Sequence, residues 1–152
     1  MFFDLNQKII FLENSDVTIK RIYKDELGDW ITPLIDAFGS GELMTKQYLL
    51  CHEKIANDKL HFYHFSLSKK DTPIASLTLS INEGVARVDD VGTVSAFQKR
   101  GYATQLLAHA LQTARMAGAK YCFLEASVSG LSVYKKIGFN PFFRNRIYTN
   151  SD

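Results

Sequence analysis

The chain has 152 residues, which fits a single domain spanning residues 1–152 with one substantial core. Hydrophobic residues make up 46% of it and aromatic residues 12%, a composition that excludes an intrinsically disordered chain. The formal net charge is only +2, and acidic and basic residues are interspersed, so we expect no nucleic-acid partner. No apolar run reaches the length of a membrane span, so we expect no membrane partner either.

The cysteines and histidines do not form a pattern typical of a metal site. Cys51 and Cys122 lie far apart, each in an apolar pattern, so we expect buried free thiols and no disulfide. The four histidines lack acidic partners at ligand spacing, and we expect no metal: they are His52, His61, His64 and His109. The first residues, MFFDLNQKIIF, have an early acid and no basic start, unlike a secretory signal, which makes a reducing cytoplasm the expected location.

The first third of the chain predicts two short strands followed by two helices. Residues 8–12 and 17–22 are apolar runs around a turn, as in strands. The first of these could be an extra edge strand or an arm swapped between subunits, and a swapped arm would fit a homodimer. Apolar side chains then recur on one side from residue 24 to 38 and again up to about residue 57, with a break at residues 39–41.

The period of the apolar residues then changes from that of a helix to that of a strand. Residues 61–67, 74–81 and 85–94 are separated by turns, which predicts an antiparallel meander. Residues 121–126 form a nearly continuous apolar run, as expected for a central strand covered on both faces. The remaining predicted elements are a short helix at residues 131–137 and last strand material at residues 139–143 and 146–148.

The stretch from residue 88 to residue 117 organises the chain. It predicts a strand, a short loop and a helix whose apolar stripe faces the core: Leu106, Leu107, Ala110, Leu111 and Ala114. Helix starts usually carry an acidic residue, yet residues 97–115 contain none and include Lys99 and Arg100. A helix start has unpaired backbone N–H groups and the positive end of the helix dipole, so this one is suited to bind an anion such as a phosphate.

Two segments resemble motifs of the GNAT N-acetyltransferase superfamily. The loop Gln98-Lys99-Arg100-Gly101-Tyr102-Ala103 resembles the family's Gln/Arg-x-x-Gly-x-Gly/Ala loop, which binds the pyrophosphate of acyl-CoA. Downstream, residues 133–139 (VYKKIGF) resemble the family's late helix, whose Tyr is the usual general acid. The two motifs stand in the family's order, separated by a helix and a strand, and the resemblance covers about residues 85–143.

The resemblance implies an α/β (α+β) fold in which a mixed, mostly antiparallel central sheet carries helices on both faces. The strand-helix-strand unit from residue 88 to residue 126 is a right-handed crossover by default, so its two strands should be parallel neighbours. In the family these two strands splay apart and acyl-CoA inserts between them. Acetyl-CoA is therefore the expected co-substrate.

The resemblance also implies how acetyl-CoA is held. Backbone amides of residues 99–104 would bind the pyrophosphate, and the strand end at Thr93 and Val94 would pair with the pantetheine arm, with an N–H near Val94 as the oxyanion donor. Ser127 and Ser129 could contact pantetheine or cap the next helix. Gly92 fits a bulge or a close backbone approach. The expected cofactor-binding residues are Thr93, Val94, Gln98, Lys99, Arg100, Gly101, Tyr102, Ala103, Thr104, Ser127 and Ser129.

Three residues are candidate catalytic groups. Tyr134, in the second motif, is the expected general acid, because a phenol is protonated at neutral pH and can donate to a leaving thiolate. Asp89 and Asp90 form an acidic pair in an otherwise apolar strand, which resembles the pair of some aminosugar acetyltransferases. Strand alternation would send them to opposite faces and leave Asp90 among apolar neighbours, where it could take a proton from a substrate ammonium. Either Asp, with Glu125 in reserve, could be the base.

The predicted function is an N-acetyltransferase that moves an acetyl group from acetyl-CoA to a primary amine by direct attack in a ternary complex. The alternative is a non-catalytic acyl-CoA-binding module of the same fold, although Tyr134 and the Asp pair favour the enzyme. The acceptor is open among small amines, amino acids, aminosugars and peptide N-termini, and the Asp pair favours a cationic small molecule. Aromatic residues of residues 30–48 and of the last strands could line its pocket or belong to the core: Trp30, Phe38, Tyr48, Phe142 and Phe143.

Overall fold

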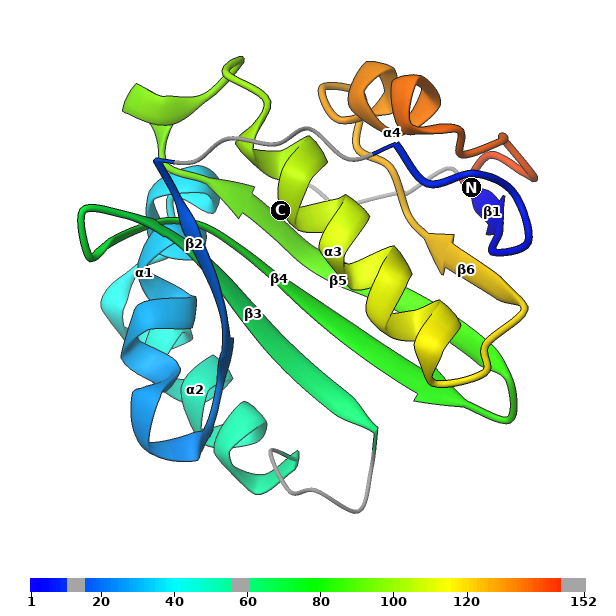
Figure 1. The fold of residues 1–152 in the computed structure, drawn as a ribbon. Coiled ribbons are helices and arrows are strands. Elements are labelled where there is room, and N and C mark those ends of the chain that lie inside the picture. Colours follow the sequence, from blue (N-terminus) through cyan, green and yellow to red (C-terminus); the bar gives the residue numbers. More distant parts are fainter. Residues whose placement is uncertain (11–15, 56–60, 146–152) are drawn as a thin grey trace.

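The computed structural model describes residues 1–10, 16–55 and 61–145. In these residues a six-stranded sheet has the strand order β1-β6-β5-β4-β3-β2 (Figure 1). The strands are β1 (Phe2–Asp4), β2 (Thr18–Ile22), β3 (Phe62–Lys69), β4 (Thr72–Asn82), β5 (Val85–Thr93) and β6 (Tyr121–Leu124). The helices are α1 (Leu27–Phe38), α2 (Glu42–Ile55), α3 (Tyr102–Met116) and α4 (Leu131–Ile137), with 3₁₀ turns at Lys24–Glu26 and Ser95–Phe97.

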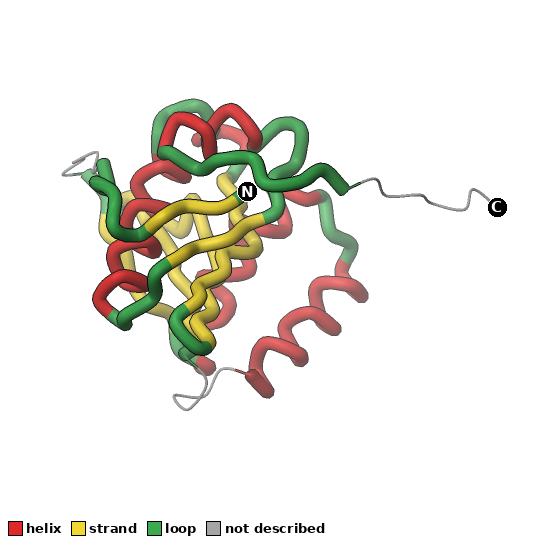
Figure 2. Tube along the Cα trace, turned by 90° about the vertical axis from the view of Figure 1, so that its right-hand side faces the viewer, coloured by secondary structure: helices red, strands yellow, loops and turns green. Residues whose placement is uncertain are grey.

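Helices cover both faces of the sheet. Figure 1 shows α3 on one face and α1 with α2 on the other, and Figure 2 shows helices on both sides of the strands. Neighbouring strands run antiparallel except β5 and β6, which run parallel and are connected through α3. The predicted fold class, a mixed and mostly antiparallel sheet with one parallel crossover, is confirmed.

The two faces of β3 and β4 bury different kinds of side chain. One face is apolar and joins α3 in a single cluster: Phe65, Leu67, Ala75, Leu77 and Leu79. The opposite face, reached by alternation along the strands, buries polar side chains: His64, Ser66, Ser76 and Thr78. Ser66 Oγ donates to the main-chain oxygen of Asp29 in α1, and the ring of His64 meets that of His52 in α2. The apolar face therefore packs on α3, and the polar face lies beneath α1 and α2.

The parallel strands β5 and β6 separate after a short paired region. Their pairing begins at Val85↔Tyr121 and ends at Val88↔Leu124, where β6 stops. β5 continues to Thr93. The end of β5 consequently has one edge without a β6 partner, as the predicted splay requires.

A β-bulge interrupts β5 at Asp90. Thr78 lies opposite Asp89 and Ser76 lies opposite Gly92, so β5 has one extra residue between these two pairs. Asp90 takes a left-handed conformation, with φ +56°. A bulge bends its strand, increases the local twist and changes the phase of side-chain alternation. Side chains before and after Asp90 therefore do not follow one continuous alternation.

Three predictions about the elements and the core are wrong. The N-terminal strand is Phe2–Asp4 and not residues 8–12: it pairs with β6, where Phe3 is fully buried, and described residues 8–10 are not in a strand. The segment 139–143 forms only an isolated bridge, Asn140 with Phe2, and residues 146–148 lie outside the described ones. Cys122 is buried as expected, whereas Cys51 is exposed on α2.

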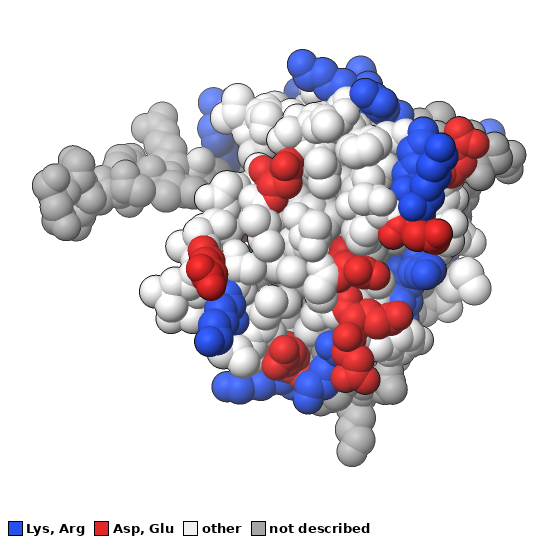
Figure 3. Space-filling view, turned by 90° about the vertical axis from the view of Figure 1, so that its left-hand side faces the viewer, with Lys and Arg blue, Asp and Glu red and all other residues white. Residues whose placement is uncertain are grey.

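The described surface carries charges of both signs. Figure 3 shows the side on which β2, α1 and α2 lie, where acidic and basic side chains are interspersed and a wide area is uncharged. On this face the basic side chains do not merge into one continuous patch. Among the helices in the described ranges, none combines the length and the apolar character needed to cross a membrane.

Candidate active site

A cleft of about 320 Å³ lies where β5 and β6 diverge, and we call it the β5–β6 cleft. The end of β5, the loop after it, the first turn of α3 and the helix α4 surround the cleft. The end of α1 contributes Ala37 and Phe38. Its other lining residues are Val91, Gly92, Thr93, Phe97, Gln98, Lys99, Gly101, Tyr102, Ala103, Thr104, Ser127, Ser129, Gly130, Val133 and Tyr134. Both sequence motifs, residues 98–103 and 133–139, therefore meet in one cleft.

The start of α3 presents free main-chain donors to this cleft. Gly101 precedes the helix with φ +86°, a conformation that suits glycine, and no side chain caps the helix start. The first helical N–H that finds a main-chain acceptor is that of Gln105, which donates to Gly101 O. The N–H groups of the first turn, which carries no acid, are thus available to an anion such as a pyrophosphate.

The two basic residues of the loop differ in position. Lys99 lines the cleft. Arg100 does not line it, and its guanidinium lies 5.7 Å from the ring centre of Phe97. Of the two side chains, Lys99 is therefore the one at the cleft, and a role of either in binding a phosphate stays a prediction.

The end of β5 bears on the oxyanion donor predicted near Val94. The N–H of Val94 itself donates to Ile74 O at 2.9 Å and is occupied within the sheet, so a donor near Val94 stays a prediction that its neighbours would have to meet. Because main-chain groups alternate along an antiparallel strand, the preceding Thr93 directs its N–H and C=O to the opposite edge, toward the cleft. Gln98 Nε2 donates to Thr93 O at 3.1 Å on that side. Thr93, and not Val94, offers main-chain groups to a ligand.

Tyr134 lies in α4 on the wall of the cleft and is 8% exposed. Burial raises the pKa of its phenol above the usual value, so the group stays protonated at neutral pH. Gly130 makes room for this ring, because a Cβ there would lie 2.8 Å from Tyr134 Cε2. A protonated phenol held this way can donate a proton to a leaving group in the cleft.

The serines before α4 line the cleft and also order the turn. The N–H of Gly130 donates to Ser127 Oγ at 3.1 Å, and Ser129 Oγ lies 3.1 Å from the same oxygen. This bond orders the turn before α4, but no side chain caps the start of the helix itself, so the helix-capping alternative for Ser127 is wrong. Contact of either serine with pantetheine stays a prediction.

The acidic pair of β5 is divided between two environments. Arg87 Nε donates to both carboxylate oxygens of Asp89, at 3.0 and 2.8 Å, and Arg87 Nη2 lies 4.0 Å from Glu125 Oε1. Asp89 and Glu125 line neither hollow, whereas Asp90 accepts a hydrogen bond from Tyr48 of α2. Strict alternation along β5 places Asp90 on the same face as Val88, two residues before it. That expectation is wrong, because the bulge turns Asp90 toward α2 while Val88 packs with α3.

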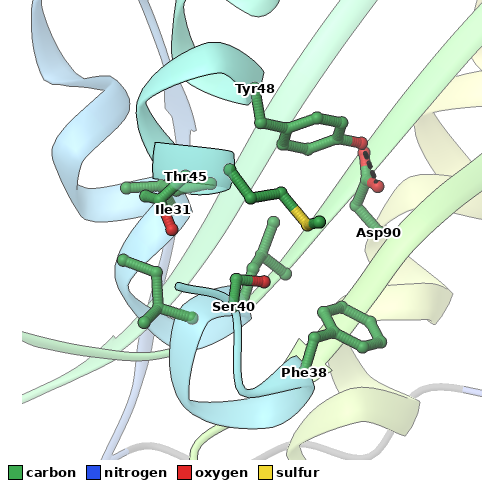
Figure 4. A pocket seen from close by; sticks show the side chains of 9 residues that line it. Ile31, Phe38, Ser40, Thr45, Tyr48 and Asp90 are labelled. Atoms are coloured by element: carbon green, nitrogen blue, oxygen red, sulfur yellow. Dashed lines mark hydrogen bonds between the residues drawn. The ribbon is translucent and has the colours of Figure 1, made fainter. Parts of the chain in front are cut away.

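Asp90 lies at one end of a second hollow, which we call the α1–α2 pocket. It holds about 160 Å³ and is lined by Ile31, Leu34, Ile35, Phe38, Ser40, Met44, Thr45, Tyr48 and Asp90 (Figure 4). Tyr48 points toward Asp90, and its hydroxyl donates to Asp90 Oδ1 at 2.6 Å. Burial and the neighbouring Asp90 both raise the pKa of Tyr48, which keeps this donor protonated. Phe38 lines both hollows, and Val91, next to Asp90, lines the β5–β6 cleft, so the two hollows adjoin.

The comparison with family models decides the classification. The model of the acetyltransferase (GNAT) family matches residues 20–139. The chain belongs to this family. No curated protein sequence matches it significantly.

Solved structures share the fold of this GNAT chain. Aminoglycoside N-acetyltransferase AAC(6')-Iy in complex with CoA has 18% identity and a TM-score of 0.73, over 93% of this chain and 99% of that one. Glucosamine-6-phosphate N-acetyltransferase from Arabidopsis thaliana has 14% identity and a TM-score of 0.71, over 88% and 99%. A Pyrococcus horikoshii protein has 22% identity and a TM-score of 0.67, and here the chain spans 82% of its own length but only 43% of the other.

Two further residues of this GNAT chain position the hollows, and sequence reasoning assigned them no role. Asp36 of α1 accepts from the N–H and the hydroxyl of Ser95, at 2.6 and 2.7 Å, which joins the end of α1 to the loop after β5. These bonds lower the pKa of the Asp36 carboxyl. The second is Gly130, beneath Tyr134. The sequence around Asp36 and Gly130 contains no signal for either role, because each residue acts through a contact that forms only in the folded protein.

Two of the five aromatic residues proposed for an acceptor pocket line the α1–α2 pocket. These are Phe38 and Tyr48, whereas Trp30 is fully buried and stacks on Tyr48. Phe142 and Phe143 are exposed, and Phe142 contacts Phe2 of β1, so they line neither hollow. In the described ranges no three His, Cys, Asp or Glu side chains come together as metal ligands would.

Proposed function

We propose that this protein transfers an acetyl group from acetyl-CoA to the primary amine of a small molecule, as an N-acetyltransferase. The observation that carries the proposal is the β5–β6 cleft, where the free N–H groups of α3 and the protonated Tyr134 face one space. Membership of the acetyltransferase (GNAT) family supports an acyltransferase. A structural neighbour was crystallised with a bisubstrate analogue of CoA and acetylneamine, which supports a ternary complex.

Docking of acetyl-CoA and the two catalytic proton transfers each have a group in place. The pyrophosphate binds the first turn of α3, and the pantetheine arm pairs with the main chain of Thr93. The substrate ammonium gives one proton to Asp90, directly or through water, and the neutral nitrogen attacks the thioester carbonyl. The C–N bond forms, the C–S bond breaks, and the thiolate takes a proton from Tyr134. The second amine proton and the proton held by Asp90 leave to solvent, from which Tyr134 regains its own.

The structure favours Asp90 over Asp89 as the base. Arg87 Nε donates to both carboxylate oxygens of Asp89, which holds this side chain against Arg87 and away from both hollows. Asp90 adjoins the cleft through Val91 and lines the α1–α2 pocket. Its hydrogen bond from Tyr48 fixes the carboxylate in position.

Calorimetric titration with acetyl-CoA tests the cofactor. We expect the parent to bind and Gly101→Glu to lose about 100-fold or more in affinity, because it places an anion and a side chain at the site for the pyrophosphate. Gly118→Glu is the matched control, because Gly118 also has a positive φ, +84°, and follows the other end of α3. Both variants carry the same charge and a similar backbone strain, so only the position differs.

Release of CoA thiol in the presence of primary amines tests catalysis. Binding of acetyl-CoA together with amine-dependent thiol release supports the enzyme. Binding without thiol release across a broad amine panel would favour the non-catalytic acyl-CoA-binding module. A folded parent that does not bind acetyl-CoA would overturn both.

A further inference from the structure

We propose that the acceptor is a small amine with one apolar substituent, a single ring or a short hydrocarbon chain. Its ammonium pairs with Asp90 and its substituent fills the α1–α2 pocket. This inference rests on the proposed function and narrows it to one class of substrate.

The lining of the pocket selects against polar acceptors. Most of its side chains are hydrocarbon or thioether: Ile31, Leu34, Ile35, Phe38 and Met44. Thr45 Oγ1 already donates to Gly41 O, and Tyr48 already donates to Asp90. The lining contains no Lys or Arg, so it offers no cation for a sugar phosphate. A sugar with several hydroxyl and ammonium groups would lose its hydration here and find few partners.

The size of the pocket limits the substituent. Its volume is about 160 Å³, and a dry apolar cavity of about 150 Å³ is large enough to take benzene. The inner wall is formed by buried Ile31 and Leu34, while Phe38 and Met44 are 62% and 67% exposed at the mouth. A single ring or a short branched chain therefore enters from the exposed end and buries its apolar surface against α1.

Charge and position place the amine at Asp90. This is the one formally charged residue among those that line the pocket. Tyr48 occupies Oδ1 of its carboxylate, which leaves Oδ2 for an ammonium. The bulge at Asp90 directs the carboxylate into this pocket, and Val91, the next residue, lines the β5–β6 cleft. An ammonium at Asp90 thus lies beside the cleft while its substituent points away from it.

The first experiment compares kcat/KM for CoA release with four primary amines: 2-phenylethylamine, isopentylamine, ethanolamine and glucosamine 6-phosphate. We expect the two apolar amines to exceed the two polar ones by at least about 10-fold, the usual effect of a filled apolar pocket. Equal or higher values for the polar amines would overturn the inference. Acetyl-CoA binding is measured on the same protein, and its absence would instead overturn the proposed function.

The second experiment uses two neighbouring residues of α2. Met44→Lys places a cation in the pocket lining, and we expect KM for 2-phenylethylamine to rise about 10-fold with no change in acetyl-CoA affinity. Leu43→Lys is the control, because Leu43 is 72% exposed and does not line the pocket. Both substitutions introduce the same charge at exposed sites of one helix. If both substitutions raise KM equally, or if neither raises it, the placement of the amine is overturned.

The third experiment tests the pairing with Asp90 without catalysis. In CoA-saturated protein, calorimetry should show 2-phenylethylamine binding about 10-fold more tightly than its neutral analogue 2-phenylethanol. In Asp90→Asn this difference should disappear while 2-phenylethanol still binds. A difference that persists in Asp90→Asn would place the ammonium elsewhere.

Discussion

The half of the molecule that forms the β5–β6 cleft differs in construction from the half that forms the α1–α2 pocket. The cleft rests on α3, where a row of side chains is fully buried: Leu106, Leu107, Ala108, Ala110, Leu111 and Ala114. The pocket is closed by α2, in which His52 is the one buried side chain. Beneath α1 and α2 the sheet buries polar groups, including His64, whose ring nitrogen lies 2.7 Å from that of His52.

This difference fits the proposed function. The cleft offers main-chain groups, which do not depend on side-chain identity and need a rigid frame. The pocket is formed by side chains of two helices, one of which has few buried contacts. Under the proposal, a fixed site for the acetyl donor adjoins an acceptor site that substitutions in α1 and α2 can reshape.

The largest expected contrast is in local stability. Amide hydrogen exchange in α3 should be slower than in α2 by about 1,000-fold, because helices with few buried contacts open at lower free energy. Exchange measured by mass spectrometry or NMR on the free protein checks this. Equal protection of both helices would contradict the division into a rigid half and a loose half.

The next largest effect is on catalysis. Tyr134→Phe should lower kcat about 100-fold, because the thiolate loses its proton donor, and should leave acetyl-CoA affinity nearly unchanged. Tyr63→Phe in β3 is the control, because Tyr63 lines neither hollow. A kcat loss shared by both variants, or absent from Tyr134→Phe, would remove Tyr134 from the mechanism.

The contact between the two halves is tested at Gly92. A Cβ at this position would lie 2.7 Å from Leu34 Cδ2 and 3.2 Å from Ala37 Cβ of α1. Gly92→Ala should therefore lower the free energy of unfolding by about 1–3 kcal/mol and raise KM for the amine. Gly28→Ala, in α1 itself with open space around it, should instead stabilise by up to about 1 kcal/mol. Denaturant unfolding curves give both values.

The last prediction concerns how the free energy of unfolding changes with pH in the half that contains the α1–α2 pocket, where the expected change per pH unit is small. Burial lowers the pKa of His64 to about 3, helped by His52 and Arg21, against an ordinary value of 6.5. As the pH falls through 6.5 the unfolded chain takes up this proton first. The free energy of unfolding therefore falls by up to about 1.4 kcal/mol per pH unit between pH 6.5 and 3.

Two variants check this acid sensitivity by thermal unfolding across pH. His64→Gln should flatten the slope, because the buried imidazole is removed. His61→Gln should leave the slope unchanged, because His61 is exposed. An unchanged slope in His64→Gln would assign the acid lability to other groups.

Sequence reasoning was strongest where the signal is local. The stripe from Leu106 to Ala114 follows from helical periodicity, and the suitability of the Gly101 helix start for an anion follows from the missing acids. Both are properties of consecutive residues. The fold class was also predicted, since a strand-helix-strand unit leaves few topologies.

Sequence reasoning failed where the outcome depends on distant pairing. The strand Phe2–Asp4 forms because β6, more than 110 residues away, has an open edge. The N–H of Val94 donates to Ile74 O within the sheet. A bulge in β5 opposite β4 turns Asp90 away from the face that alternation predicts. Register and bulges are set by the partner strand, which a reading of β5 alone does not include.

The sequence by itself determined the four helices, the strands β2 to β6, the anion-suited start of α3 and the phenol of Tyr134, because these depend on residue identity and short-range geometry. Only the tertiary structure decided where the N-terminal strand forms, which acid lines the α1–α2 pocket, which main-chain N–H groups are free, and that Gly130 and Asp36 order the walls of the hollows. Those properties arise from contacts between segments far apart in the chain. Hydrogen bonding and burial at such contacts are fixed only when the sheet and its helices are assembled.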